Sequence, residues 1–198
     1  MTRPLPPQFY RRDTEIVARE LLGCRLVRIY KGKRLSGRII ETEAYLGIHD
    51  RAAHSYGGRR TERVRSMYLP GGHAYVYFVY GMHFCVNVVT REAEEPEAVL
   101  LRAIEPIEGV EIMRKLRGMK RDRDLANGPG KLCQALAIDR KFDGLVLDES
   151  SGLFIERDPS FKREEHIILA TPRIGIAYAQ EAVHWPLRFV LERKNEKV

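Results

Sequence analysis

The sequence predicts an α+β fold: a single domain with a curled antiparallel β-sheet, peripheral helices and a protruding β-hairpin. Short segments rich in β-branched and aromatic residues recur along the chain between turn residues, which is typical of antiparallel strands. Few segments carry helix start and stop signals. The 198 residues contain no internal repeat or long linker, and their 44% apolar content is enough for one core. We therefore expect residues 1–198 to form one domain.

The first half of the chain predicts a helix, a β-hairpin and a long loop. Asp13 is a suitable N-cap for the helix, and Gly23 is a suitable stop. The hairpin strands are rich in β-branched residues, and Gly32 permits the turn between them. The loop that follows has little periodicity, which is typical of a functional segment. The expected ranges are 14–22 for the helix, 24–30 and 35–45 for the strands, and 46–72 for the loop.

The second half predicts further strands and two helices. Gly81 divides an apolar-aromatic stretch into two strands, and Pro106 and Pro129 occupy the first-turn positions of the helices. The expected strands are 74–80, 82–90, 97–105, 145–147, 153–156, 166–170 and 187–191. The expected helices are 106–117 and 130–138.

Composition indicates a basic protein with a polyanionic partner. Lysine and arginine total 34 against 27 acidic residues, which gives a net charge of +7 and a pI near 9.4. Such a balance favours phosphate contacts with counterion release, although charge alone does not identify the partner. The chain has no run of roughly 20 apolar residues and no apolar signal-peptide core. We expect an intracellular protein, cytoplasmic or nucleoid-associated (nuclear in a eukaryote), with no membrane partner.

Three cysteines, Cys24, Cys85 and Cys133, have apolar neighbours and lack the C-x-x-C spacing of zinc or redox sites. We expect them to be buried, reduced thiols.

Residues 39–45 predict an extended strand that carries two carboxylates. Period-2 alternation places four of its residues on one face. A strand emerging into solvent, with each glutamate paired to an arginine, fits this pattern. A pocket in which one carboxylate is a general base and a tyrosine stacks on a flat ligand also fits. Alternation does not choose between the two carboxylates. The shared face holds Ile39, Glu41, Glu43 and Tyr45.

His54 lies in a loop of small residues that can bring an imidazole to the same pocket. A lone histidine is more often solvated or paired inside the protein. A metal held by Glu41, Glu43 and His54 would match no common zinc or magnesium pattern, so we expect no metal.

Aromatic residues and methionine continue up to the expected turn at Gly81, where hairpins usually carry Asn, Asp, Gly or Ser. An exposed tip with Tyr80 and Met82 suits insertion between base steps through a minor groove. A tip buried within the same domain fits equally well. A three-residue turn would place Tyr77 opposite Asn87, a ring beside an amide that can hydrogen-bond a ligand.

Two further features concern charge. Arg102 lies in an apolar strand, where a guanidinium needs a partner: a pocket carboxylate, a phosphate, or a purely structural ion pair. Gly130 and Lys131 follow Asn127-Gly128-Pro129 at a helix start, where backbone N–H groups and Lys131 can meet a phosphate. The spacing is not that of a nucleotide P-loop. In the long loop, four arginines are candidate backbone contacts or members of a solvated basic loop: Arg59, Arg60, Arg63 and Arg65.

Together these segments resemble the alkyladenine (3-methyladenine) DNA glycosylase family. The resemblance covers most of the chain after the first helix, and several ordered motifs are more specific than any single one. The motifs are Glu41-Thr42-Glu43-Ala44-Tyr45-Leu46-Gly47, Ala52-Ala53-His54-Ser55, Tyr75-Val76-Tyr77 with Tyr80-Gly81-Met82, Val99-Leu100-Leu101-Arg102-Ala103, Gly128-Pro129 with Lys131-Leu132-Cys133-Gln134-Ala135-Leu136, and Pro186-Leu187-Arg188-Phe189.

The resemblance implies a role for each position that matches a motif. Glu43 is the general base that deprotonates the attacking water, with Arg102 helping to hold that water and the nucleotide. The backbone carbonyl near Ile174 also touches the water. Four residues form the base pocket and two intercalate. The pocket residues are Tyr45 and Tyr77, which sandwich the flipped base, His54, which donates a hydrogen bond, and Asn87, which excludes normal guanine; the intercalating residues are Tyr80 and Met82.

The implied function is excision of alkylated or deaminated purines of the 3-methyladenine, 7-methylguanine and hypoxanthine type from double-stranded DNA, by a monomer without a cofactor. Extrusion of the base costs about a few kcal/mol, less for a damaged pair. No lysine nucleophile is required, so the product is an abasic site without strand cleavage. His83 departs from the expected aromatic beside the wedge. A non-catalytic module that binds damaged DNA and a metal-dependent nuclease are the competing hypotheses.

Overall fold

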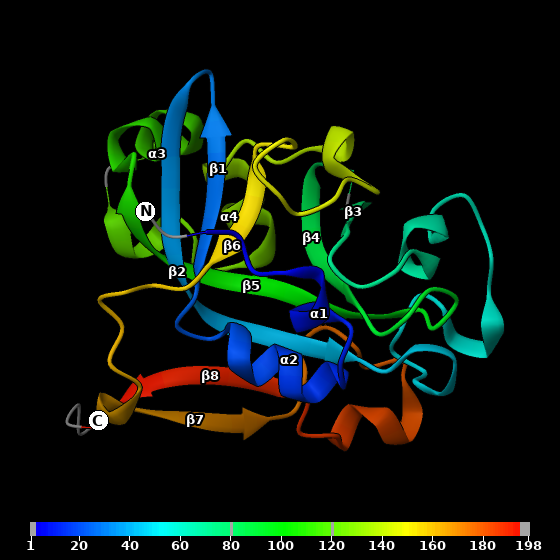
Figure 1. The fold of residues 1–198 in the computed structure, drawn as a ribbon. Coiled ribbons are helices and arrows are strands. Elements are labelled where there is room, and N and C mark those ends of the chain that lie inside the picture. The colour runs from blue at the N-terminus through cyan, green and yellow to red at the C-terminus, as the bar shows by residue number, and fades with distance from the viewer. Residues whose placement is uncertain (1–2, 80, 120, 195–198) are drawn as a thin grey trace.

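An antiparallel sheet is the framework of the computed structural model, which describes residues 3–79, 81–119 and 121–194 (Figure 1). Its main path runs β3-β4-β5-β2-β1-β6, and β8 joins β2 and carries β7. This arrangement confirms the predicted α+β class with a curled antiparallel sheet. The strands are β1 (Arg25–Tyr30), β2 (Lys33–Tyr45), β3 (Ala74–Val79), β4 (His83–Thr90), β5 (Glu97–Glu108), β6 (Leu153–Glu156), β7 (His166–Thr171) and β8 (Arg188–Arg193).

Short helices lie at the margins of the sheet. Asp13 caps α2 by accepting hydrogen bonds from the backbone N–H groups of Glu15 and Ile16, as its position predicted. The helices are α1 (Pro7–Tyr10), α2 (Thr14–Leu21), α3 (Val110–Arg117) and α4 (Pro129–Ala135). The 3₁₀ helices are η1 (Gly47–His49), η2 (Tyr56–Gly58), η3 (Arg65–Tyr68), η4 (Asp122–Asp124), η5 (Arg140–Phe142), η6 (Arg163–Glu165) and η7 (Gln180–His184).

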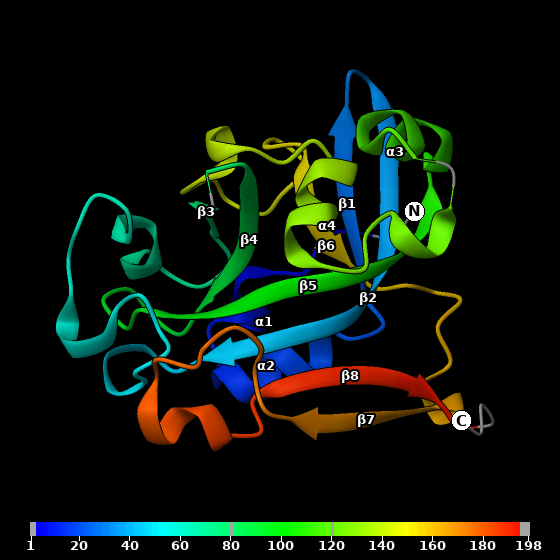
Figure 2. The same cartoon turned by 180° about the vertical axis from the view of Figure 1, so that it is seen from behind.

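Strands β2 and β5 run side by side through the middle of the sheet (Figures 1 and 2). The first part of β2 pairs with β1, and its last part pairs with β8. At this second end, the segment after β2 and the segment before β8, cyan and orange in the figures, lie near each other in both views. The fold thus brings two long loops to one end of its longest strand pair.

The expected alternation in β2 is interrupted. The β2–β5 register shifts between Ile39 and Glu41 and again between Glu41 and Thr42. Ile39 is packed in the main hydrophobic cluster with Ala44, so it does not share the face of Glu43, as strict alternation had predicted.

Pro106 does not start a helix. It lies in β5 opposite Gly37, beside a register shift between Ser36 and Gly37, where a missing N–H is tolerated. Helix α3 begins instead after Gly109, whose φ of 71° is in the left-handed region.

Two other segments differ from prediction. Residues 145–147 form no strand, and Val146 makes only an isolated bridge to His73. The arm before Asp13, expected to be loose, contains α1, which buries Phe9 and Tyr10.

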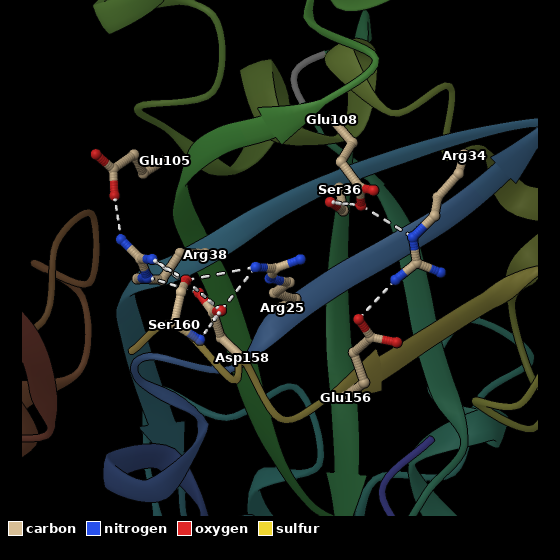
Figure 3. A network of polar contacts seen from close by, with 9 residues as sticks. All are labelled: Arg25, Arg34, Ser36, Arg38, Glu105, Glu108, Glu156, Asp158 and Ser160. Carbon is tan, nitrogen blue, oxygen red and sulfur yellow. Dashed lines mark hydrogen bonds and ion pairs between the residues drawn. The ribbon is translucent and has the colours of Figure 1, made fainter. Parts of the chain in front are cut away.

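A network of ion pairs stabilises one end of the β2–β5 pair (Figure 3). This end is the one that lies away from the two loops. Asp158, whose side chain is buried, accepts hydrogen bonds from Arg25 and Arg38 at 2.8 Å each. Ser160 adds a hydroxyl donor at 2.7 Å. Burial would raise the pKa of Asp158, but these donors hold it well below its ordinary value.

A third arginine, Arg34, links three strands in the same network. It contacts Glu108 of β5 at 2.9 Å and the buried Glu156 of β6 at 2.6 Å (Figure 3). Ser36 also donates to Glu108. We refer to the residues drawn in Figure 3 as the Asp158 network.

Within the part of the chain that the structure describes, no helix is long and apolar enough to cross a membrane.

Candidate active site

A cavity of about 410 Å³ opens at the end of the sheet where the two loops meet. This volume lies in the range of small-molecule pockets. Strands β2 to β5, the loop after β2, the start of α4 and the segment before β8 all contribute to it. The lining residues are Tyr45, Ala52, His54, Arg63, Met67, Tyr75, Tyr77, Val79, His83, Cys85, Asn87, Ala98, Leu100, Arg102, Pro129, Gly130, Ile174, Gly175, Ile176 and Tyr178.

Glu43 is fully buried next to this cavity, at 0% exposure. One of its carboxylate oxygens accepts a hydrogen bond from the backbone N–H of Ile174, and the other from the hydroxyl of Tyr45, both at 2.8 Å. Burial raises the pKa of Glu43 above its ordinary value, against the opposing effects of Arg102 and these two donors. A carboxyl group with a raised pKa is suited to accepting a proton.

Arg102 lies between two carboxylates. Its Nε donates to Oε1 of Glu41 at 2.7 Å, and its Nη1 is 3.3 Å from Oε1 of Glu43. Arg188 of β8 also donates to Oε1 of Glu41, at 2.6 Å. Burial lowers the pKa of Arg102, but Glu43 and Glu41 raise it further, so the net shift is upward. Of the partners that the sequence left open for Arg102, the structure shows two carboxylates of β2.

Tyr45 lines the cavity, and its ring contacts Arg173 and a small apolar cluster. The guanidinium of Arg173 lies 4.7 Å from the centre of its ring and pairs with Asp50, and both of these charged side chains are fully buried. Arg173 also donates to the carbonyl of Ala44 at 2.8 Å. Tyr45 and Trp185 pack against one small apolar cluster. This cluster consists of Ala52, Ile176, Ala179 and Ala182.

Another part of the cavity lining is a group of rings. Tyr77 lies 4.6 Å from His54 and 5.3 Å from Tyr75, centre to centre. Nδ1 of His54 is 2.7 Å from the Tyr75 hydroxyl. Burial, helped by Arg63 and Arg59, lowers the pKa of His54 to about 4. The imidazole is therefore neutral at neutral pH.

Asn87 also lines the cavity, and it is buried. Its Nδ2 donates to the backbone carbonyl of Tyr75 at 3.1 Å. The predicted register is wrong: Tyr75 lies opposite Asn87, and Tyr77 lies opposite Cys85. The cause is the turn, since Val79 pairs with His83. Tyr77 and Asn87 nevertheless line the same cavity.

At the hairpin tip, Met82 is 70% exposed, as expected for a protruding β3–β4 hairpin. Tyr80, the predicted wedge, lies outside the described residues. His83 packs closely on α4, because a Cβ added at Gly130 would lie 3.1 Å from its side chain. Lys131 does not line the cavity, and its Nζ donates to Oδ1 of Asn127 at 2.8 Å.

The four loop arginines divide into two groups. Arg60 pairs with Glu94, and Arg65 lies 3.5 Å from Glu62. Arg63 lines the cavity, 5.4 Å from the centre of the Tyr77 ring, and Arg59 is near enough to affect the pKa of His54. The basic loop is thus partly paired and partly directed at the cavity.

Among the described residues, the structure brings together Glu43, Arg102 and all four predicted base-pocket residues. No group of three or more His, Cys, Asp or Glu side chains that could hold a metal ion occurs among the residues described. Four residues of the site received no such role from the sequence. Cys85 had been considered only as a buried thiol and Tyr75 only as part of a motif. The Asp50–Arg173 pair joins positions too far apart in sequence for any local pattern to link.

Comparisons with known proteins agree with this geometry. The family model described as "Methylpurine-DNA glycosylase (MPG)" matches residues 8–195. A protein of Bacillus mycoides named "Putative 3-methyladenine DNA glycosylase" is 49% identical over 95% of this chain and 96% of its own length. Proteins with the same name from Bdellovibrio bacteriovorus and Desulfitobacterium hafniense are 52% and 51% identical, over 94% and 93% of both chains.

The match spans nearly the whole chain and includes the strands and loops that form the cavity, so the resemblance inferred from the motifs is confirmed. The chain therefore belongs to the methylpurine-DNA glycosylase family, and it is a DNA glycosylase.

Proposed function

We propose that this chain flips an alkylated or deaminated purine out of duplex DNA and hydrolyses its N-glycosidic bond with a water activated by Glu43. The observation that carries the proposal is the buried carboxylate of Glu43 beside an aromatic-walled cavity. A base inside the stack cannot be attacked, so a cavity of this kind is needed to receive it.

The walls suit a flat and electron-poor ligand. The rings of Tyr45 and Tyr77 both face the cavity, and alkylation makes a purine cationic, which favours contact with electron-rich rings. Neutral His54 has one ring nitrogen engaged with Tyr75, which leaves the other for the base or its nucleotide. To Asn87, which lines the same cavity, the proposal gives the role of excluding the exocyclic amine of normal guanine.

In the proposed step, the C1′–N bond of the nucleotide breaks and its electron pair leaves with the purine. The water oxygen bonds to C1′, and its proton passes to Glu43. A carboxylate has about four acceptor positions, and the hydrogen bonds from Ile174 and Tyr45 use two of them. Among the described residues that line the cavity none is a lysine, which supports simple hydrolysis without strand cleavage.

The exposed hairpin tip at Met82 supports insertion into the duplex, and the N-terminus of α4 with Lys131 supports contact with the DNA backbone. Action as a monomer is part of this proposal.

The test is single-turnover excision from duplex DNA that carries one hypoxanthine or one 7-methylguanine. Wild-type protein should produce abasic sites, and Glu43→Gln should reduce the rate by at least about 10³-fold while DNA binding persists. Absence of abasic sites at any excess of wild-type protein would favour the non-catalytic binding module. Near-normal turnover by Glu43→Gln would refute the role of Glu43. A panel of damaged bases would then rank the substrates.

A further inference from the structure

Strand β2 carries two carboxylates, Glu41 and Glu43, and the proposed reaction gives a role only to Glu43. The side chain of Glu41 is largely buried, and a single oxygen, Oε1, accepts hydrogen bonds from two arginines. Arg102 donates from β5 at 2.7 Å, and Arg188 donates from β8 at 2.6 Å. Two short charge-assisted bonds fix the carboxylate between three strands.

Arg102 is held unequally by its two carboxylates. Its Nε is 2.7 Å from Glu41, whereas its Nη1 is 3.3 Å from Glu43. Charge-assisted hydrogen bonds between these groups are normally 2.7–2.9 Å long, so Arg102 is bonded to Glu41 and held back from Glu43.

The separation has a chemical consequence for Glu43. Each of its oxygens already accepts one hydrogen bond, from Ile174 or from Tyr45. A direct bond from Arg102 would occupy a further acceptor position and would stabilise the anion, which makes a weaker base.

We propose that Glu41 is a positioning residue: it holds Arg102 at a distance from Glu43, with Arg188 fixing Glu41 in place. The inference rests on the proposed function, in which Glu43 is the general base. Arg102 then stabilises charge near the water without neutralising the base that activates it.

The charges around Glu43 make this arrangement testable by pH. Burial raises the pKa of Glu43, Arg102 lowers it most among the charged groups, and Glu41 raises it. The groups that face Glu43 are Glu41 and Tyr45 from β2, Arg102 from β5, Tyr77 from β3, Cys85 from β4, Arg188 from the facing position of β8, and the backbone N–H of Ile174.

Loss of the Glu41 charge should therefore lower the pKa of Glu43 in two ways. A negative neighbour is removed, and Arg102 becomes free to bond directly to Glu43. Both effects have the same sign.

The experiment measures single-turnover excision of 7-methylguanine against pH. This base leaves as a neutral molecule from a cationic nucleotide, so it needs no general acid and the acidic limb reports the base alone. The variants are Glu41→Gln, which keeps the shape, and Glu41→Met, which removes the acceptor. Glu43→Gln is the inactive reference. Glu156→Gln is the matched control, since it is a buried carboxylate bonded to Arg34 in the same sheet.

We expect Glu41→Gln to lower the maximal rate about tenfold and to move the acidic limb to lower pH, with a larger effect in Glu41→Met. Glu156→Gln should leave the limb in place. Thermal unfolding of each variant at each pH gives the folded fraction, and the rates are divided by this fraction before the limbs are compared.

Three results would overturn the inference: an unchanged profile, a lower rate with an unmoved limb, or a limb moved to higher pH. Failure of the proposed function is separate, because it would appear as an inactive wild-type protein or an active Glu43→Gln.

Discussion

The two ends of the β2–β5 pair carry acid–arginine clusters of opposite character. In the Asp158 network at one end, Asp158 accepts hydrogen bonds from two arginines and a serine, and its pKa is held low. At the other end, Glu43 receives hydrogen bonds from a backbone N–H and a tyrosine, with Arg102 at 3.3 Å, and its pKa is raised. Carboxylates and arginines clustered at the two ends of one strand pair thus give one anion that is fully compensated and one that is not.

The difference teaches how to separate structural from reactive carboxylates. A buried anion surrounded by strong donors contributes to the fold and has no reason to accept a proton. A buried anion with fewer or more distant donors costs stability and gains basicity. Perturbing each cluster should therefore affect different properties.

The largest loss of stability should come from Asp50→Asn. This variant tests whether the buried Asp50–Arg173 ion pair beside the cavity has a structural role. Both Asp50 and Arg173 are buried, and Asp50 also accepts from the backbone N–H groups of Leu46 and Ala52. Loss of the charge leaves Arg173 buried without a counter-ion, so the free energy of unfolding should fall by about 4 kcal/mol. Urea denaturation measures this loss. A change below 1 kcal/mol would show that the pair does not support the loops.

Asp158→Asn should cause the next largest loss of stability, about 3 kcal/mol in the free energy of unfolding. Because the network is remote from the cavity, the single-turnover rate per folded molecule should stay within about twofold of wild type. A selective loss of rate would contradict the division between the two ends of the strand pair.

Tyr45→Phe removes one donor from the reactive cluster and keeps the ring. The Tyr45 hydroxyl lowers the pKa of Glu43, so its loss should move the acidic limb of the rate profile to higher pH. We expect the rate near neutral pH to fall about tenfold, which is about 1.4 kcal/mol in the barrier. The shift is opposite in sign to that expected for Glu41→Gln, so the two variants serve as controls for each other.

The smallest effect concerns the dependence of stability on pH. In the folded protein His54 has its pKa lowered from 6.5 to about 4, so it binds fewer protons than in the unfolded chain. Its contribution is complete above about pH 6.5 and is lost as pH falls toward 4. Between about pH 7 and pH 5.5 the wild type should lose about 1 kcal/mol more than His54→Asn.

Asp158 and His54 contribute to the pH dependence of stability in different pH ranges. The lowered pKa of Asp158 gives stability that is present above its ordinary pKa of 3.8 and is lost only at lower pH. Equal slopes for wild type and His54→Asn between pH 7 and 5.5 would show that His54 is not held neutral by the fold.

Much of the fold was predictable because its signals are local. The Asp13 cap, the glycine turn between β1 and β2 and the two aromatic strands around Gly81 all lie within a few residues of the structure they specify. Pro106 was misassigned because a proline at a register shift in a strand has the same local sequence as a helix start.

The sequence predicted which residues belong to the site better than it predicted their contacts with one another. Glu43, Tyr45 and Arg102 could be identified from their motifs, and the structure brings them together. The register that pairs Tyr75 with Asn87 depends on the turn, and the partners of Glu41 depend on β8, almost 150 positions away in the chain. Contacts of this kind depend on how distant strands pair in the sheet, and no local periodicity of the sequence indicates them.

The apolar cluster behind Tyr45 has an optical consequence. Trp185 is the single tryptophan of the chain, and it packs on the same four residues that support the pocket wall. Any rearrangement of Tyr45 when a ligand enters would change the surroundings of this one indole. Its intrinsic fluorescence should therefore report occupation of the cavity directly, in unlabelled wild-type protein and on the millisecond scale of a stopped-flow measurement.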